Sequence, residues 1–247
     1  MVSAAINGIS IFYERQGEGA PLLLLHGFTG YGRDWRHVFP DPIDGYTTIS
    51  PDLRGHGRTL NPSGNFTFRQ VGLDTLALLD HLGIARVKAI GMSLGANTLL
   101  HMATQQPDRV DAMVLVSTTP YFPAEARSIM GQFSFDALPE EERGIQRERH
   151  TGGEEQIQSL FAIARGFKDS YTDMNFTPPH LATIRARTLI VHGDRDPLYP
   201  VELALQMYRA IADAQLWVVP NAGHSPIFGQ YAAAFRDAAI SFLRGSS

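Results

Sequence analysis

The feature that most constrains the fold is a set of six short, mostly apolar segments spread along the sequence. Each is too short for a buried helix, and none alternates apolar with polar residues as a half-exposed strand does. Parallel strands that helices cover on both faces have this composition. We therefore expect six buried strands, at residues 21–25, 47–49, 87–90, 112–116, 188–191 and 216–219.

Helical spacing separates these segments. Apolar residues recur every three or four positions over residues 71–82, which predicts a helix there. Thr67 and Gln70 form a capping-box pattern before its start, and Gly83 is placed to end it. A hairpin is expected at the sheet edge, turning at Asn7-Gly8. Strand–helix alternation of this kind predicts an α/β fold, a mostly parallel sheet flanked by helices. Further helices are expected near residues 99–106, 200–211 and 231–242.

One segment of the chain differs in composition from the rest. Residues 121–180 contain six basic and ten acidic residues, so they account for the whole net charge of −4, and they hold eight of the 24 aromatic residues. Pro120 and Pro123 open the segment, and Pro178-Pro179 close it. We interpret residues 120–180 as an inserted, mainly helical cap on a core domain made of residues 1–119 and 181–247.

The strongest chemical motif is Gly91-Met-Ser-Leu-Gly95, which follows an expected strand and opens an expected helix. A serine on such a sharp turn needs small neighbours two positions away, because the backbone crowds it. The free N–H groups of the helix start can stabilise developing negative charge. This context predicts that Ser93 is a nucleophile.

A serine nucleophile needs a base, and a carboxylate must orient that base. Of nine histidines, His224 is the best candidate, since its loop follows the last expected strand and so shares the sheet edge with Ser93. The other eight are more readily explained as structural or solvated. Asp196, in the loop after residues 188–191, is the favoured acid; Asp194 is a second candidate and Asp52 a third.

Acyl transfer also requires donors for the oxyanion of its tetrahedral intermediate. The backbone N–H of Leu94, directly after the nucleophile, is one. The loop His26-Gly27-Phe28 follows an earlier strand, and there Gly27 permits close approach while Phe28 offers its N–H. We expect Phe28 and Leu94 to form an oxyanion hole.

Five blocks in this order resemble the α/β-hydrolase superfamily: H-G-F at 26–28, P-D-L-R-G-H-G at 51–57, G-M-S-L-G at 91–95, H-G-D-R-D-P at 192–197 and N-A-G-H-S-P at 221–226. The resemblance implies that fold with an inserted cap, and Ser93, Asp196 and His224 as catalytic residues. Serine rather than aspartate at 93 argues against the dehalogenase and epoxide-hydrolase branches. The loop after His26 lacks the G-P-G-A stretch of the C–C bond hydrolases.

These observations predict a carboxylic-ester hydrolase that works through an acyl-enzyme on a small-molecule substrate. Aromatic residues of the cap are expected to line an apolar substrate pocket: Phe122, Phe133, Phe161 and Phe167. The same triad also suits lactone opening, C–C cleavage or a synthase-type elimination, and a low-turnover ligand receptor of this fold is a further alternative. The sequence does not indicate the oligomeric state.

Composition excludes several other classes. The chain has no cysteine and therefore no thiolate nucleophile, disulfide or cysteine-bound metal. Ester hydrolysis through an acyl-enzyme requires neither a metal nor a cofactor. A net charge of −4 is not that of a nucleic-acid-binding protein. No apolar stretch approaches membrane-spanning length, and the first eight residues do not resemble a signal peptide. We therefore expect a soluble, cytoplasmic protein without a membrane or nucleic-acid partner.

Overall fold

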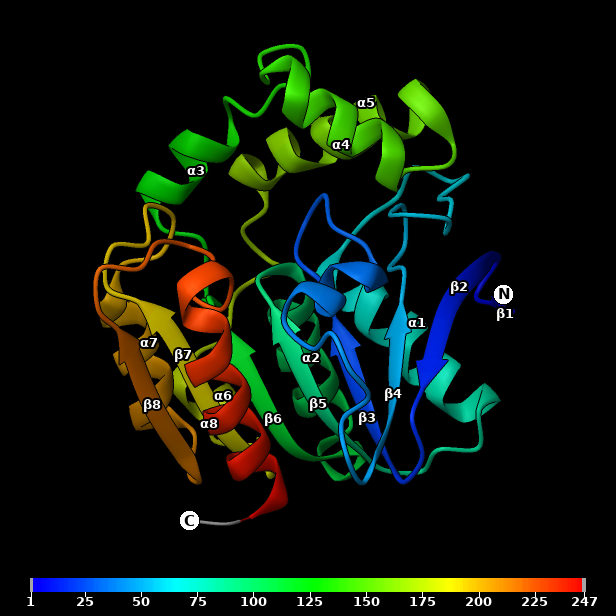
Figure 1. Ribbon diagram of the computed structural model, residues 1–247. Helices are drawn as coiled ribbons and strands as arrows, with labels where there is room; N and C mark the ends of the chain where they lie inside the picture. The colour runs from blue at the N-terminus through cyan, green and yellow to red at the C-terminus, as the bar shows by residue number, and fades with distance from the viewer. Residues whose placement is uncertain (1, 246–247) are drawn as a thin grey trace.

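The computed structural model describes residues 2–245, in which eight strands form one sheet of order β1-β2-β4-β3-β5-β6-β7-β8 (Figure 1). β1 and β2 form the expected antiparallel edge hairpin, β2 pairs antiparallel with β4, and all other pairs are parallel. The mostly parallel α/β sheet is thus confirmed. The strands are β1 (Val2–Ile6), β2 (Ile9–Gln16), β3 (Ala20–Leu25), β4 (Tyr46–Pro51), β5 (Val87–Met92), β6 (Val110–Val116), β7 (Arg187–Gly193) and β8 (Ala214–Val219).

Helices cover both faces of this sheet, as the buried apolar segments require. Side chains of α1, α2 and α7 form one core with the first face, and those of η1 and α8 form a second core with the opposite face. The helices of these two layers are η1 (Gly32–His37), α1 (Phe68–His81), α2 (Leu94–Gln105), η2 (Pro107–Arg109), α7 (Val201–Ala210), η4 (Gly229–Tyr231) and α8 (Ala232–Arg244).

The start of α1 realises only half of the expected capping box. Thr67 Oγ1 accepts the N–H of Gln70 at 3.0 Å, but the Gln70 side chain donates to Asp74 at 2.9 Å instead of returning to the cap. Asp74 is buried and also pairs with Arg54, so it offers Gln70 a stronger, charged acceptor. Gly83, with φ of +69°, lies two residues beyond the helix end, where the left-handed conformation favours glycine.

The parallel strands end in one row, and this row positions the site. Leu25 of β3 is level with Gly91 of β5, Met92 of β5 with Val116 of β6, and Val116 with Val191 of β7. The loops that follow β3, β5, β7 and β8 therefore emerge side by side at the carboxyl edge of the sheet.

Most of the chain between β6 and β7 lies above this carboxyl edge, where Figure 1 shows α3, α4 and α5, while α6 lies beside the sheet next to α7. The segment leaves and rejoins the sheet at one place: the N–H of Phe176 donates to the carbonyl of Pro120 at 2.9 Å, and Tyr121 forms a β-bridge with Asn175. Within residues 2–245, none of the helices has the length and apolar character needed to cross a membrane. The helices between β6 and β7 are α3 (Ala124–Met130), α4 (Glu140–Arg149), α5 (Gly153–Gly166), η3 (Phe167–Asp169) and α6 (Pro178–Leu181).

Candidate active site

Ser93 lies on a strained turn between β5 and α2, with φ of 49° and ψ of −107°. Both flanking glycines are sterically required. A Cβ on Gly91 would overlap the backbone of Gly95, and a Cβ on Gly95 would overlap the carbonyl of Leu25 on the neighbouring strand β3. The turn packs so closely against the sheet that only hydrogen fits at these positions, as the motif suggests, and the serine hydroxyl projects beyond the strand end.

Ser93, His224 and Asp196 lie in a hydrogen-bonded line, although the sequence separates them widely. His224 Nε2 is 2.9 Å from Ser93 Oγ, and His224 Nδ1 is 2.7 Å from Asp196 Oδ2. The carboxylate accepts the Nδ1 hydrogen, so Nε2 is free to accept the hydroxyl proton of the serine. This arrangement is chemically able to generate an alkoxide nucleophile.

Asp196 is held as an ionised acceptor. Its side chain is fully buried, and Oδ1 accepts the backbone N–H groups of Leu198 at 2.8 Å and Tyr199 at 3.2 Å. Burial alone would raise the pKa of Asp196. The hydrogen bond and positive field of His224, together with the two backbone donors, outweigh burial and hold that pKa below its usual value.

The two other candidate carboxylates have structural partners. Asp194 accepts the N–H of Ala222 at 3.2 Å and so ties the loop after β7 to the loop that carries His224. Asp52 is buried and accepts the N–H groups of Gly32 at 2.8 Å and Arg58 at 2.9 Å. Neither carboxylate is hydrogen-bonded to His224, which has Asp196 as its only carboxylate partner among residues 2–245.

The expected oxyanion donors, Phe28 and Leu94, line the same cavity as Ser93. Within residues 2–245, neither backbone N–H has a hydrogen-bond acceptor, so both are available to a ligand. The carbonyl of Gly27, which belongs to the same peptide unit as the Phe28 N–H, is held from two sides. Gly30 N–H donates to it at 3.0 Å and His26 Nδ1 at 2.8 Å.

The cavity above Ser93 has a volume of about 320 Å³. Among the four expected pocket residues, Phe133, Phe161 and Phe167 line it. Phe122 does not: its ring is buried behind the wall, 5.7 Å from the ring of Phe68 and 5.9 Å from that of Phe167. Phe122 therefore supports the pocket from behind, which corrects the expectation for this residue.

Several cavity residues had not been anticipated. Asn97 lies one helical turn after Ser93, a spacing that could have revealed it; it accepts the hydroxyl of Thr118 at 2.7 Å. Tyr199 packs edge-on against His224, with 5.3 Å between ring centroids, and burial raises the pKa of its hydroxyl. Glu142 and Gln146 of α4 also reach the cavity, but that helix has no apolar stripe by which its inner face could be recognised.

Buried histidines in and around the site predict an acid-labile fold. Burial lowers the pKa of His26 to about 3 and those of His101 and His150 to about 4, and it also lowers the pKa values of His56 and His192. In the unfolded chain these groups titrate near 6.5, so between pH 6.5 and 4 the unfolded state binds more protons. The contribution of these histidines to the free energy of unfolding is therefore fully present above pH 6.5 and is lost as the pH falls towards 4.

We expect the free energy of unfolding to decrease by several kcal/mol from pH 7 to 5, since each unit of lowered pKa corresponds to about 1.4 kcal/mol. Urea titrations at half-unit pH intervals measure this slope. His81→Gln is the control, because it removes a histidine whose side chain is exposed and leaves all of the buried ones in place. A stability that is flat between pH 7 and 5 would contradict the prediction.

Comparison with known proteins agrees with this architecture. Residues 20–141 match the family described as alpha/beta hydrolase fold, and residues 172–247 match the family described as TAP-like protein. The chain is 28% identical over 251 residues to 2-hydroxymuconate semialdehyde hydrolase of Pseudomonas sp. (strain CF600), covering 88% of this chain and 84% of that enzyme.

Two further similarities differ in extent. Over 117 residues the chain is 35% identical to soluble epoxide hydrolase of Corynebacterium sp. (strain C12); this match spans 47% of the chain and only 41% of that relative. The solved structure of a meta-cleavage product hydrolase from Pseudomonas fluorescens IP01 superposes with a TM-score of 0.81 at 24% identity, covering 100% of this chain and 98% of that one. With the sheet order and the glycine-flanked Ser93 turn, these matches show that the chain belongs to the α/β-hydrolase superfamily.

Proposed function

We propose that this protein hydrolyses uncharged carboxylic esters through a Ser93 acyl-enzyme. The observation that carries the proposal is the hydrogen-bonded line of Ser93, His224 and Asp196 in the wall of a largely apolar cavity. A serine hydroxyl in line with an imidazole and a buried carboxylate is equipped for acyl transfer, and its chemistry needs no further group to proceed.

In the first half-reaction Ser93 Oγ attacks the ester carbonyl while its proton passes to His224 Nε2. Collapse of the tetrahedral intermediate breaks the C–O bond to the alcohol, and the imidazolium returns the proton to the departing oxygen. In the second half-reaction His224 takes a proton from water, whose oxygen attacks the acyl carbonyl. Collapse of this second intermediate breaks the bond to Ser93 Oγ, the imidazolium returns the proton to that oxygen, and the acid leaves. Asp196 keeps the imidazole in the required tautomer and stabilises the imidazolium in both steps.

The negative oxygen of each intermediate is assigned to the N–H groups of Phe28 and Leu94. Both are unused donors at the cavity wall, and Leu94 is the first residue of α2, where the helix dipole favours negative charge. Losing one such donor typically costs ~2.7–4 kcal/mol in the barrier.

Residues 120–180 are proposed to act as the cap of this site. Their apolar side chains form much of the cavity wall above Ser93 and exclude water from the acyl group. The members from this segment are Met130, Phe133, Leu138, Phe161, Ala164 and Phe167.

The charges at the cavity favour an uncharged substrate. Among residues 2–245 no lysine or arginine lines it, and Glu142 is the one wall residue that is an acid. Arg149 lines a neighbouring cavity, but it is paired with Asp34 at 2.9 Å. A substrate carboxylate inside the apolar cavity would lose its hydration without gaining a counter-charge, which costs several kcal/mol.

C–C bond hydrolysis is the second candidate, because a relative that covers 88% of this chain is named for its action on 2-hydroxymuconate semialdehyde. That substrate is a carboxylate, and no lysine or arginine of the described residues lines the cavity to pair with it. Lactones are cyclic uncharged esters, and opening one uses the same steps as the proposed reaction. They therefore fall within the proposed substrate class.

A matched substrate panel tests the proposal. The pair p-nitrophenyl butyrate and mono-p-nitrophenyl succinate has acyl chains of equal carbon number and differs by a terminal carboxylate; γ-butyrolactone and a 2-hydroxy-6-oxo-dienoate complete the panel. We expect kcat/KM for the neutral ester to exceed that for the charged ester by about tenfold or more, a difference of at least ~1.4 kcal/mol. Every rate is measured against Ser93→Ala as the blank.

Ser93-dependent cleavage of the dienoate that exceeds cleavage of all the esters would replace ester hydrolysis by C–C hydrolysis as the function. Equal kcat/KM for the two matched esters would overturn the preference for uncharged substrates while leaving the ester chemistry in place.

A further inference from the structure

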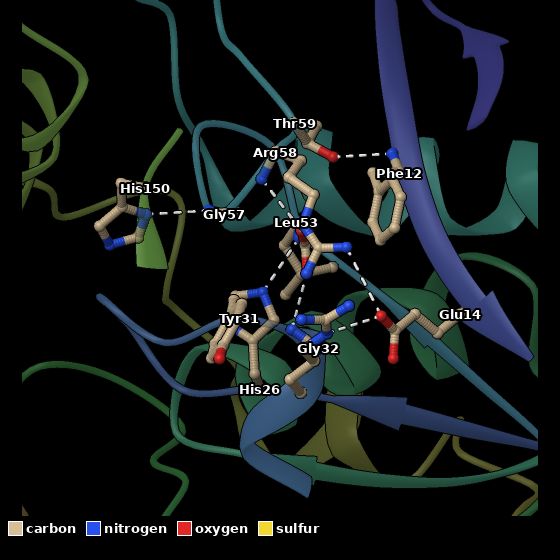
Figure 2. Close-up of polar contacts among 12 residues, drawn as sticks. Phe12, Glu14, His26, Tyr31, Gly32, Leu53, Gly57, Arg58, Thr59 and His150 are labelled. Atoms are coloured by element: carbon tan, nitrogen blue, oxygen red, sulfur yellow. Dashed lines mark hydrogen bonds and ion pairs between the residues drawn. The ribbon is translucent and has the colours of Figure 1, made fainter. Parts of the chain in front are cut away.

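A histidine from the segment above the sheet reaches the loop that carries the Phe28 N–H. His150 follows the last residue of α4, and its side chain is buried. Its Nδ1 accepts the N–H of Gly57 at 2.9 Å, a contact that Figure 2 shows. Because Nδ1 accepts, the one ring hydrogen is on Nε2, which shares it between the carbonyl of Thr29 at 3.2 Å and Gln146 Oε1 at 3.1 Å.

From Thr29 a chain of peptide hydrogen bonds leads to the expected oxyanion donor. The Thr29–Gly30 peptide accepts from His150 at its carbonyl and donates from its N–H to the carbonyl of Gly27 at 3.0 Å. The next peptide in this chain, Gly27–Phe28, ends in the free N–H of Phe28. Both peptides are trans and planar, so fixing each carbonyl fixes the direction of the N–H on its opposite side.

The loop needs such external support. Thr29 has φ of 60°, a left-handed conformation that is unfavourable for a β-branched residue. A carbonyl that accepts a hydrogen bond also polarises its own peptide and makes its N–H a stronger donor. The interaction with His150 therefore acts on both the position and the donor strength of the loop.

We propose that His150 is a positioning residue for the oxyanion hole. It couples the packing of segment 120–180 above the sheet to the orientation of the Phe28 N–H. The proposal rests on the proposed function, since it assigns that N–H to the tetrahedral intermediate. His150 does not touch the substrate; it acts through the peptides of Thr29 and Gly27.

Two amide replacements separate the two hydrogen bonds of His150. In His150→Asn the amide is at the position of Nδ1, so it retains the bond to Gly57 and loses the bond to Thr29. In His150→Gln the amide extends to the position of Nε2 and retains a donor for Thr29. We expect kcat on p-nitrophenyl butyrate to fall about tenfold in His150→Asn and to recover in His150→Gln. The expected fall is smaller than the 10²–10³-fold loss of kcat that follows complete removal of an oxyanion donor, because His150→Asn only misplaces the donor.

KM should change less than about twofold in both variants, because the oxyanion forms in the transition state and the tetrahedral intermediate and is absent from the bound substrate. Affinity for an alkylboronic acid, whose tetrahedral adduct on Ser93 occupies the same donors, should fall in parallel with kcat. Gln156→Met is the matched control. Gln156 Nε2 donates to the carbonyls of Gly55 at 2.9 Å and Gly57 at 3.1 Å, so its loss weakens the same contact region without touching the loop at 26–30.

Hydrogen exchange of the peptide spanning residues 26–34, in protein without substrate, gives a readout independent of turnover. Faster exchange in His150→Asn than in His150→Gln and Gln156→Met supports the proposal. Equal exchange rates in the three variants would overturn the proposal. So would a kcat for His150→Asn that is no lower than that of Gln156→Met when the two variants have similar melting temperatures. If wild-type hydrolysis does not depend on Ser93, the proposed function has failed, and exchange alone decides the role of His150.

Discussion

Replacing Ser93 with alanine is expected to lower kcat for ester hydrolysis by at least about 10⁴-fold while leaving the protein folded. Among residues 2–245 the Ser93 hydroxyl is the one nucleophile hydrogen-bonded to His224, and removing it leaves only catalysis by the oxyanion donors and the cavity. Stopped-flow and end-point assays with p-nitrophenyl butyrate measure the loss, and circular dichroism verifies the fold. A rate within tenfold of wild type would show that Ser93 is not the nucleophile.

The pair Ser93→Ala and Ser93→Gly adds a matched test of backbone strain. Both variants lack the hydroxyl, but only glycine adopts φ of 49° without steric cost. Strain of this kind typically costs ~1–3 kcal/mol, so Ser93→Gly should unfold at a higher urea concentration than Ser93→Ala. If the two variants were equally stable, the turn would not store the strain that its dihedral angles indicate.

Replacing Asp196 with asparagine is expected to reduce kcat by about 10⁴-fold. Asparagine preserves the shape and can still accept the N–H groups of Leu198 and Tyr199. Its NH₂ group, however, then faces His224 Nδ1, which must become an acceptor. The imidazole hydrogen moves to Nε2, and the ring can no longer take the proton of Ser93.

Asp194→Asn is the control for the choice between the two neighbouring carboxylates. Asp194 only accepts the N–H of Ala222, and asparagine can accept it too, so we expect a loss of no more than about fivefold, the net value of one ordinary hydrogen bond. A larger loss in Asp194→Asn than in Asp196→Asn would reverse the assignment. Both variants should be assayed at pH 7 or above, where the buried histidines do not weaken the fold.

Much of the architecture was predictable from local sequence patterns. All six apolar segments lie in strands, because parallel strands that helices cover on both faces bury mostly apolar side chains. Gly91 and Gly95 identified the Ser93 turn because the crowding there is a property of the turn itself. The family assignment followed from blocks such as residues 91–95 and 192–197, and the comparisons confirm it.

Other parts were not predictable, because they depend on contacts between distant segments. Phe122 is an aromatic residue of the segment expected to line the pocket, but it packs against the rings of Phe68 and Phe167, which line the cavity in its place. The face of α4 that reaches the cavity has no apolar pattern, and His150 resembles any other histidine until the chain brings it to Thr29. A polar contact across 121 residues leaves no periodic signal in the sequence.

The sequence by itself determined the α/β class, the order of the elements and the residue types able to perform acyl transfer, because periodicity and turn chemistry are local properties of the chain. Only the tertiary structure decided which carboxylate pairs with His224, which aromatic rings line the cavity, and that the cavity carries no cation among the described residues. These features depend on the parallel register that aligns the strand ends and on the packing of segment 120–180 above them. Distances of a few ångströms between remote residues decide the chemistry, and local sequence does not encode them.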